Sequence, residues 1–301
     1  MTGPNGKVRD GVILCGVFTV LIASLFTPFS LVTIWFLPLP FFLYTVRHSW
    51  PSALFPAAVL GALALILLHP LWIFGVLFAA ATGMAMGAFY RSTAASGTDV
   101  VLAGLVVGAA VLLLGLAAAQ YGFGLLSEFQ RLWQEQWDLV AEMVQNSVPE
   151  ASVPPLPPLS AVLPLFLSVL TVPTVLLSAW AGRRFLVRSG FPEKRLPPFH
   201  RWRFPKSFLF YYLVSCVAAF LFDAESWAYS FFAGSFMILD ILFAVQGLSF
   251  LSFLLHRKGL SRGWLWLAVF ALFLPPAAFL LLVLGIMDVG TRMRERLEEG
   301  S

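Results

Sequence analysis

Apolar residues occur along this chain in nine long runs separated by shorter polar segments. The runs cover residues 11–29, 31–46, 53–68, 71–90, 100–120, 159–180, 207–222, 227–255 and 264–287. Because a helix of about 20 apolar residues spans the hydrocarbon layer of a membrane, runs of this kind predict transmembrane helices. We therefore expect an all-α fold, a polytopic transmembrane helical bundle of about nine spans, or eight if the last run does not cross.

Prolines interrupt the second and the ninth of these runs. Pro38 and Pro40 remove backbone donors from the second run, and lipid cannot replace the lost hydrogen bonds, so we expect this segment to lie inside the bundle. Pro275 and Pro276 interrupt the ninth run, where a kinked crossing is favoured over a re-entrant pair. A single crossing would place the tail, residues 288–301, outside.

A polar interruption between the fifth and sixth runs contains an amphipathic segment. Its apolar residues recur at helical spacing and are Leu125, Phe129, Leu132, Trp133, Trp137, Val140, Met143 and Val144. This spacing predicts an external amphipathic helix at about residues 124–147. Its polar face carries carboxylates, so electrostatic anchoring to an anionic membrane is not expected. The helix either lies in the outer interface through Trp133 and Trp137, or covers the outer mouth of the bundle as a lid, where these tryptophans are candidate ligand contacts.

The charges of the loops predict the orientation of the chain. Residues 183–206 contain eight cations and one carboxylate, whereas residues 121–158 contain five carboxylates and one cation. The positive-inside rule places the first stretch in the cytoplasm and the second outside, and five crossings from a cytoplasmic N-terminus agree. We expect a multi-pass protein of the bacterial cytoplasmic (inner) membrane, with a membrane core at 1–187, a cytoplasmic basic loop at 188–206 and three further helices with a polar tail at 207–301.

The composition excludes several classes of protein. Apolar residues make up 59% of the chain, charged residues 11%, and the mean hydropathy is +0.87, values far from those of soluble domains. The net charge of +4 comes from cations in loops, so no nucleic-acid partner is expected. Cys15 and Cys216 lie in apolar runs, and no histidines have metal-ligand spacing, so we expect no disulfide, no metal and no cofactor.

Small residues at spacing four predict where helices approach closely. Gly83 and Gly87 form one G-x-x-x-G pattern and Gly104 and Gly108 form another, in consecutive runs. Such spacing lets helix backbones touch in membranes. We interpret both pairs as packing sites within the chain rather than as a dimer interface.

Ionisable residues inside the membrane are the candidates for chemistry, because placing a charge there is costly. Asp240 lies near the middle of the eighth run, and together with Gln246 it is a candidate ligand-binding residue. The competing interpretation is a carboxyl group that hydrogen-bonds to a neighbouring helix. Asp288 and Arg292 are four residues apart, which predicts a local salt bridge at the end of the last run.

The basic loop offers a candidate site for a cytoplasmic partner. Its cations alternate with aromatic residues, and the candidate residues are Arg195, Phe199, Arg201, Trp202 and Arg203. The competing interpretation is that the loop only sets the orientation and contacts lipid headgroups.

Several short motifs resemble those of the YybS-like family of bacterial membrane proteins. They are Leu196-Pro-Pro-Phe-His-Arg-Trp-Arg-Phe-Pro205, Gln246-Gly-Leu-Ser249, Gly285-Ile-Met-Asp288 with Arg292, and the early Phe36-Leu-Pro-Leu-Pro40 before Arg47. The first six spans also resemble the substrate-binding S component of energy-coupling-factor vitamin transporters. That resemblance implies a six-helix core that holds a small ligand near its outer face and depends on separate membrane and ATPase subunits.

The chain departs from the S-component pattern in two ways: its first span has no clear A-x-x-x-A coupling face, and three extra spans follow. The leading hypothesis is a non-enzymatic integral membrane protein that binds a small molecule or lipid. The alternative is a membrane scaffold or assembly factor that docks a cytoplasmic partner through its basic loop. A third hypothesis, an intramembrane enzyme, depends only on Asp240 and Asp288 and on whether they share a polar cavity.

Overall fold

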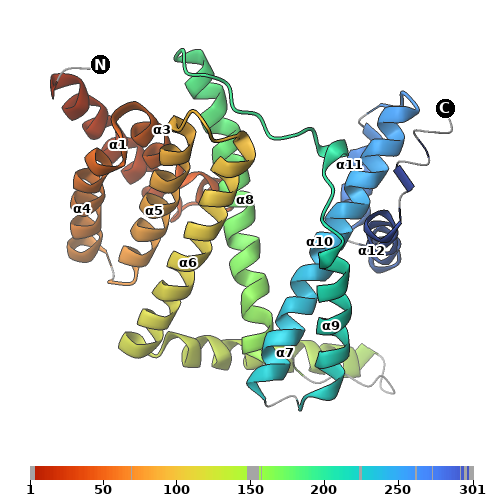
Figure 1. The fold of residues 1–301 in the computed structure, drawn as a ribbon. Coiled ribbons are helices and arrows are strands. Elements are labelled where there is room, and N and C mark those ends of the chain that lie inside the picture. The colour runs from red at the N-terminus through yellow and green to blue at the C-terminus, as the bar shows by residue number, and fades with distance from the viewer. Residues whose placement is uncertain are drawn as a thin grey trace. The chain divides into compact units, whose positions relative to one another are not determined.

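The computed structural model describes residues 4–68, 70–147, 156, 158–223, 226–261, 263–272, 274–291, 293–294 and 297. Every regular element in these residues is a helix (Figure 1). The α-helices are α1 (Pro4–Ser24), α2 (Ser30–Thr33), α3 (Leu39–His48), α4 (Trp50–Leu67), α5 (Trp72–Arg91), α6 (Gly97–Phe123), α7 (Leu125–Ser147), α8 (Leu159–Arg188), α9 (Ser207–Leu221), α10 (Trp227–Arg257), α11 (Gly263–Ala271) and α12 (Pro275–Gly290), and the 3-10 helices are η1 (Ile34–Phe36) and η2 (Phe199–Arg201). The predicted all-α class is confirmed.

Within the described residues, six helical segments are long and apolar enough to cross a membrane, and seven if α11 and α12 together form one span. The remaining spans of the predicted nine stay predictions. α1 carries Lys7, Arg9 and Asp10 in its first turns. α9 has 15 residues, or about 22 Å of helix, which is shorter than the hydrocarbon layer. α11 and α12 are bent by 112° relative to each other.

The chain divides into two compact units. The N-terminal unit contains Met1–Leu139 and Leu167–Leu196, and the C-terminal unit contains Val140–Phe166 and Pro197–Ser301. Helices α7 and α8 therefore contribute to both units. The boundary between the units falls inside the basic loop: residues up to Leu196 belong to the N-terminal unit, and residues from Pro197 belong to the C-terminal unit. The predicted boundary lay at residue 188 instead.

The proline-containing second run is broken into α2, η1 and α3, and α3 lies in the interior of the N-terminal unit. Pro40 stands in the first turn of α3, where its missing N–H needs no partner inside the helix, and it is buried. α3 packs on α5 at Gly83 and Gly87, because a Cβ on Gly83 would overlap the Pro38 carbonyl oxygen and one on Gly87 would lie 2.5 Å from Thr45 Cβ. The predicted interior position is therefore found for α3, whereas α2 and η1 contain no buried residue.

The second glycine pair lies where α6 meets its neighbours. A Cβ on Gly104 would lie 2.8 Å from Met86 Cγ of α5, and one on Gly108 would lie 3.0 Å from Thr82 Oγ1 of the same helix. All four predicted packing glycines therefore stand at contacts between helices of one chain.

The predicted amphipathic helix is present as α7, which runs crosswise to α6 from the point where α6 ends (Figure 1). Gly124 makes this change of direction, because its φ of 61° lies in the left-handed region that L side chains rarely adopt. The Gln120 side-chain oxygen then accepts a hydrogen bond from Leu126 N at 2.7 Å and caps the new helix. No residue of α7 is buried.

α10 and α12 make the closest backbone contact of the C-terminal unit. A Cβ on Gly247 would overlap the Leu281 carbonyl oxygen, and a Cβ on Gly285 would overlap the Phe243 carbonyl oxygen. Glycine at both positions thus lets the two backbones touch.

Asp10 of α1 joins α3 through a buried histidine. His48 Nε2 lies 2.8 Å from Asp10 Oδ2, and the His48 side chain is 1% exposed. The hydrogen bond from His48 lowers the pKa of Asp10, burial partly opposes it, and the charges of His48, Arg47 and Arg9 add to the lowering.

Replacing Asp10 with alanine should therefore lower the free energy of unfolding by about 1–3 kcal/mol, because buried His48 loses its acceptor. In the unchanged protein the contribution is complete above the ordinary pKa of an aspartate. It is lost as the pH falls through the lowered pKa of Asp10. Thermal unfolding of both proteins across this pH range measures the effect. Arg9→Ala is the control, since Arg9 is exposed and pairs with Asp10 only at 3.5 Å; equal melting temperatures for the two variants would contradict the prediction.

Candidate functional site

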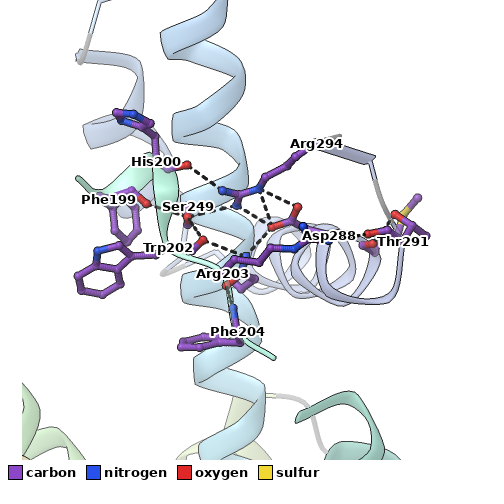
Figure 2. A network of polar contacts seen from close by, with 11 residues as sticks. Phe199, His200, Trp202, Arg203, Phe204, Ser249, Asp288, Thr291 and Arg294 are labelled. Atoms are coloured by element: carbon purple, nitrogen blue, oxygen red, sulfur yellow. Dashed lines mark hydrogen bonds and ion pairs between the residues drawn. The ribbon is translucent and has the colours of Figure 1, made fainter. Parts of the chain in front are cut away.

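Four polar side chains from distant parts of the sequence meet in the C-terminal unit (Figure 2). Asp288 at the end of α12 accepts hydrogen bonds from Arg294, with Nε at 2.8 Å from Oδ1 and Nη2 at 2.6 Å from Oδ2. Gln246 of α10 donates to the same carboxylate at 2.5 Å, and Ser249, one turn later, accepts from Arg294 Nη2 at 3.3 Å. We call these four residues the polar network.

The polar network fixes the basic loop against α10. Arg294 Nη1 donates to the His200 carbonyl oxygen at 2.7 Å, and the Ser249 hydroxyl lies 2.8 Å from the carbonyl oxygens of Phe199 and Trp202. The side chain of Gln246 also accepts from Phe204 N at 3.1 Å. Backbone groups that would otherwise lack partners in an irregular segment are thus satisfied by side chains of α10 and by Arg294.

Charge within the polar network is balanced at its buried centre. Asp288 is 0% exposed and Arg294 is 7% exposed, and they form a salt bridge. A buried ion pair is tolerated when its remaining donors and acceptors are also hydrogen-bonded, which holds for Arg294 through His200 and Ser249. The guanidinium plane suits this role because its donors have a fixed fork geometry. The network can therefore hold Arg294 in one position.

A cavity of about 440 Å³ opens beside the polar network. Its lining consists of four arginines, two histidines and one phenylalanine: His200, Arg201, Arg203, Phe253, His256, Arg257 and Arg294. The imidazole rings of His200 and His256 are stacked with centroids 4.3 Å apart. No carboxylate is among the described residues of this lining. We call it the cationic cavity.

The motifs that form this site match a family of membrane proteins along nearly the whole chain. The family model described as "Predicted membrane protein (DUF2232)" matches residues 15–289, which include the basic loop, α10 and α12. The chain belongs to this family. As a DUF2232 member with several long apolar helices, it is a multi-pass membrane protein.

A curated relative of this DUF2232 protein comes from Bacillus subtilis (strain 168). That protein, described as "Uncharacterized protein YybS", is 24% identical over 304 residues, which cover 97% of this chain and 98% of the relative. The resemblance to the YybS-like family is confirmed. No solved structure matches the chain, and the likeness of its first six spans to S components stays a prediction.

The two predicted ligand-binding residues of α10 have different partners. Asp240 accepts a hydrogen bond from Tyr212 Oη of α9 at 2.8 Å. This contact is of the kind expected if Asp240 is a carboxyl group that hydrogen-bonds to a neighbouring helix. Gln246 is 1% exposed and its amide is occupied within the polar network. Asp240 and Asp288 thus have separate partners, and the hypothesis of an intramembrane enzyme, which depended on these two carboxylates, stays a prediction.

The predicted partner-binding residues are divided between the two units. Arg195 belongs to the N-terminal unit, where it pairs with Glu193 at 2.7 Å and lowers the pKa of that carboxyl through the hydrogen bond. Phe199 and Trp202 belong to the C-terminal unit, where their carbonyl oxygens face Ser249. Arg201 and Arg203 are the remaining two predicted partner-binding residues, and both line the cationic cavity.

The predicted tryptophan contacts on α7 are half-buried. Trp133 and Trp137 lie on the same face of the helix, and neither lines the cationic cavity or the apolar cavity described next. The two alternatives for α7, a helix in the outer interface and a lid over the bundle, both stay predictions.

A second cavity lies in the N-terminal unit between α1, α4 and α5. Its volume is about 320 Å³, and it is lined by Phe18, Thr19, Ile22, Ala23, Phe26, Leu60, Leu63, Ala64, Leu67, Leu68, Trp72 and Val76. Among the described residues of this lining, Thr19 is the one polar residue. The rings of Phe26 and Trp72 lie 5.3 Å apart at one end of it. We call it the apolar cavity.

Sequence reasoning missed Arg294. Helical spacing suggested Arg292 as the partner of Asp288. Arg292 lies outside the described residues, and the described partner is Arg294, six positions after Asp288. A signal was present, because three arginines follow a carboxylate at the end of an apolar run.

Proposed function

We propose that this protein is a non-enzymatic membrane protein that binds a small, mostly apolar molecule or lipid in the apolar cavity. The single observation that supports the proposal is the lining, in which eleven of the twelve described residues are apolar and three are aromatic. Ligand sites are typically concave, mostly apolar and about 300–1,000 Å³ in volume. A cavity of about 320 Å³ falls at the lower end of that range, so the ligand is expected to be small.

The position of the apolar cavity agrees with the predicted orientation. Phe26 follows the end of α1, and Leu68 and Trp72 flank the connection between α4 and α5. With a cytoplasmic N-terminus, these ends of the helices face outside in the inner membrane. A site at the outer side of the first spans is what the resemblance to S components implies, and it supports uptake or capture of a ligand from that side.

The test is a thermal-unfolding screen of the full chain in nanodiscs of synthetic phosphatidylcholine, with a panel of vitamins and neutral apolar compounds. A ligand present at about 100 times its Kd stabilises the native state by about 2.7 kcal/mol. We expect at least one compound to raise the melting temperature of the unchanged protein. A panel without any such compound would overturn the proposal.

Filling the apolar cavity should remove that response. Ala23 is exposed towards the cavity, so Ala23→Phe adds a ring there without entering the close-packed core. Ala62→Phe is the matched control, because Ala62 is an exposed residue of α4 outside the lining. We expect the ligand-induced shift to be lost in Ala23→Phe and kept in Ala62→Phe; equal shifts in both variants would place the ligand elsewhere.

A further inference from the structure

The cationic cavity contains more positive charge than its described surroundings compensate. Asp288 balances Arg294, and Arg203 donates to the Thr291 carbonyl oxygen at 3.2 Å, a neutral partner. No described carboxylate forms an ion pair with Arg201 or Arg257, and both side chains are exposed. The Arg201 and Arg257 guanidinium groups thus face this space without a described counter-charge.

The walls of this cavity are built rather than accidental. Arg201 and Arg203 stand on the loop whose carbonyl groups are held by Ser249 and Arg294, while His256 and Arg257 end α10. The buried salt bridge with Asp288 also fixes the Arg294 guanidinium, which lies 5.3 Å from the centre of the Phe253 ring. The polar network therefore brings the cations of the basic loop close to those at the end of α10. These charged groups need little rearrangement to bind a ligand.

We infer that the cationic cavity is a binding site for a phosphate group, carried either by an anionic lipid or by a soluble compound. Guanidinium groups bind phosphate oxygens through paired, charge-assisted hydrogen bonds, and the negative charge of a phosphate would relieve the repulsion between Arg201 and Arg257. Basic pockets beside transmembrane helices on the cytoplasmic side bind anionic headgroups. The volume of about 440 Å³ leaves room for more of the ligand than one phosphate. This site is independent of the apolar cavity and of the function proposed for it.

The decisive variant removes two cations that the fold does not use. Arg201→Gln/Arg257→Gln lowers the charge of the cationic cavity by two while leaving Arg294 and the polar network intact. The control Arg188→Gln/Lys258→Gln makes the same change in net charge at exposed residues outside the lining, one of them adjacent to Arg257. Equal melting temperatures of the three proteins without ligand establish that the variants are folded.

Two arms distinguish the sources of the phosphate. In the first, inorganic phosphate is added to the full chain in phosphatidylcholine nanodiscs and thermal unfolding is followed, with chloride at equal ionic strength as the reference because salt screens exposed charges. In the second, the chain is placed in nanodiscs with and without phosphatidylglycerol, and bound lipid is counted by native mass spectrometry.

We expect binding in at least one arm, weakened about ten-fold or more in Arg201→Gln/Arg257→Gln and unchanged in the control pair. Stabilisation by inorganic phosphate identifies a soluble phosphate compound, and retention of phosphatidylglycerol alone identifies a lipid headgroup. The inference is overturned if neither probe binds, or if the cavity variant and the control pair bind both probes equally.

Discussion

Replacing Arg294 with methionine should lower the free energy of unfolding by about 3–5 kcal/mol, because Asp288 would be left as a buried charge without its cation. The carboxylate is 0% exposed and would keep only the hydrogen bond from Gln246. The carbonyl oxygen of His200 and the hydroxyl of Ser249 would also lose a donor. Thermal or denaturant-induced unfolding of the full chain in nanodiscs measures the loss.

Two further variants separate this effect from a general loss of charge. Arg188→Met removes an exposed arginine and should change stability by less than about 0.5 kcal/mol. The double replacement Asp288→Leu/Arg294→Met removes both charges and should recover part of the stability, since an apolar pair leaves no unpaired ion. If Arg294→Met melts like Arg188→Met, the salt bridge does not stabilise the C-terminal unit.

Gly285→Ala should be strongly destabilising, because it adds a methyl group where the backbones of α10 and α12 touch. The new Cβ would overlap the Phe243 carbonyl oxygen, which belongs to a helix backbone and cannot rotate away as a side chain would. Overpacking of this kind costs about 3 kcal/mol, and separation of α10 from α12 would also disturb the polar network that depends on both helices. A strongly lowered melting temperature in nanodiscs is the expected result.

The matched control is the same substitution where space is available. Gly75 lies inside α5 and a Cβ there would have nothing within 4 Å. Gly75→Ala should therefore leave stability unchanged or raise it by about 0.5–1 kcal/mol, because alanine is the better helix former. Similar melting temperatures for Gly285→Ala and Gly75→Ala would show that α10 and α12 do not touch at this glycine.

The sequence predicted the parts of the fold that depend on local pattern. The apolar runs marked most of the helices, the spacing of Leu125 to Val144 predicted α7, and Pro38 and Pro40 marked an interior segment. The count of spans was less reliable. Hydrophobicity does not show where Pro275 and Pro276 bend the chain, and it does not reveal that the helix at residues 207–221 is only 15 residues long.

The candidate sites were harder to predict because their contacts cross long stretches of sequence. Gln246 was predicted as a candidate ligand contact, and the sequence did not indicate its partners: Asp288 is 42 positions away, and the others are backbone groups of the basic loop. The same loop looked like a single surface for a partner, whereas Arg195 and Arg201 belong to different units. Local charge pattern finds cations, and only the tertiary structure shows which of them share a cavity.

We infer two binding sites of different chemistry in this chain, one in each unit. The melting temperatures of Ala23→Phe and Arg201→Gln/Arg257→Gln in nanodiscs test this inference. Each variant is measured with the apolar compound that most stabilises the unchanged protein, and separately with a phosphate probe. The phosphate probe is inorganic phosphate or phosphatidylglycerol, whichever the unchanged protein binds. We expect Ala23→Phe to lose only the response to the apolar compound and Arg201→Gln/Arg257→Gln to lose only the response to the phosphate probe. If either variant loses both responses, or if neither loses any, the claim of two independent sites is wrong.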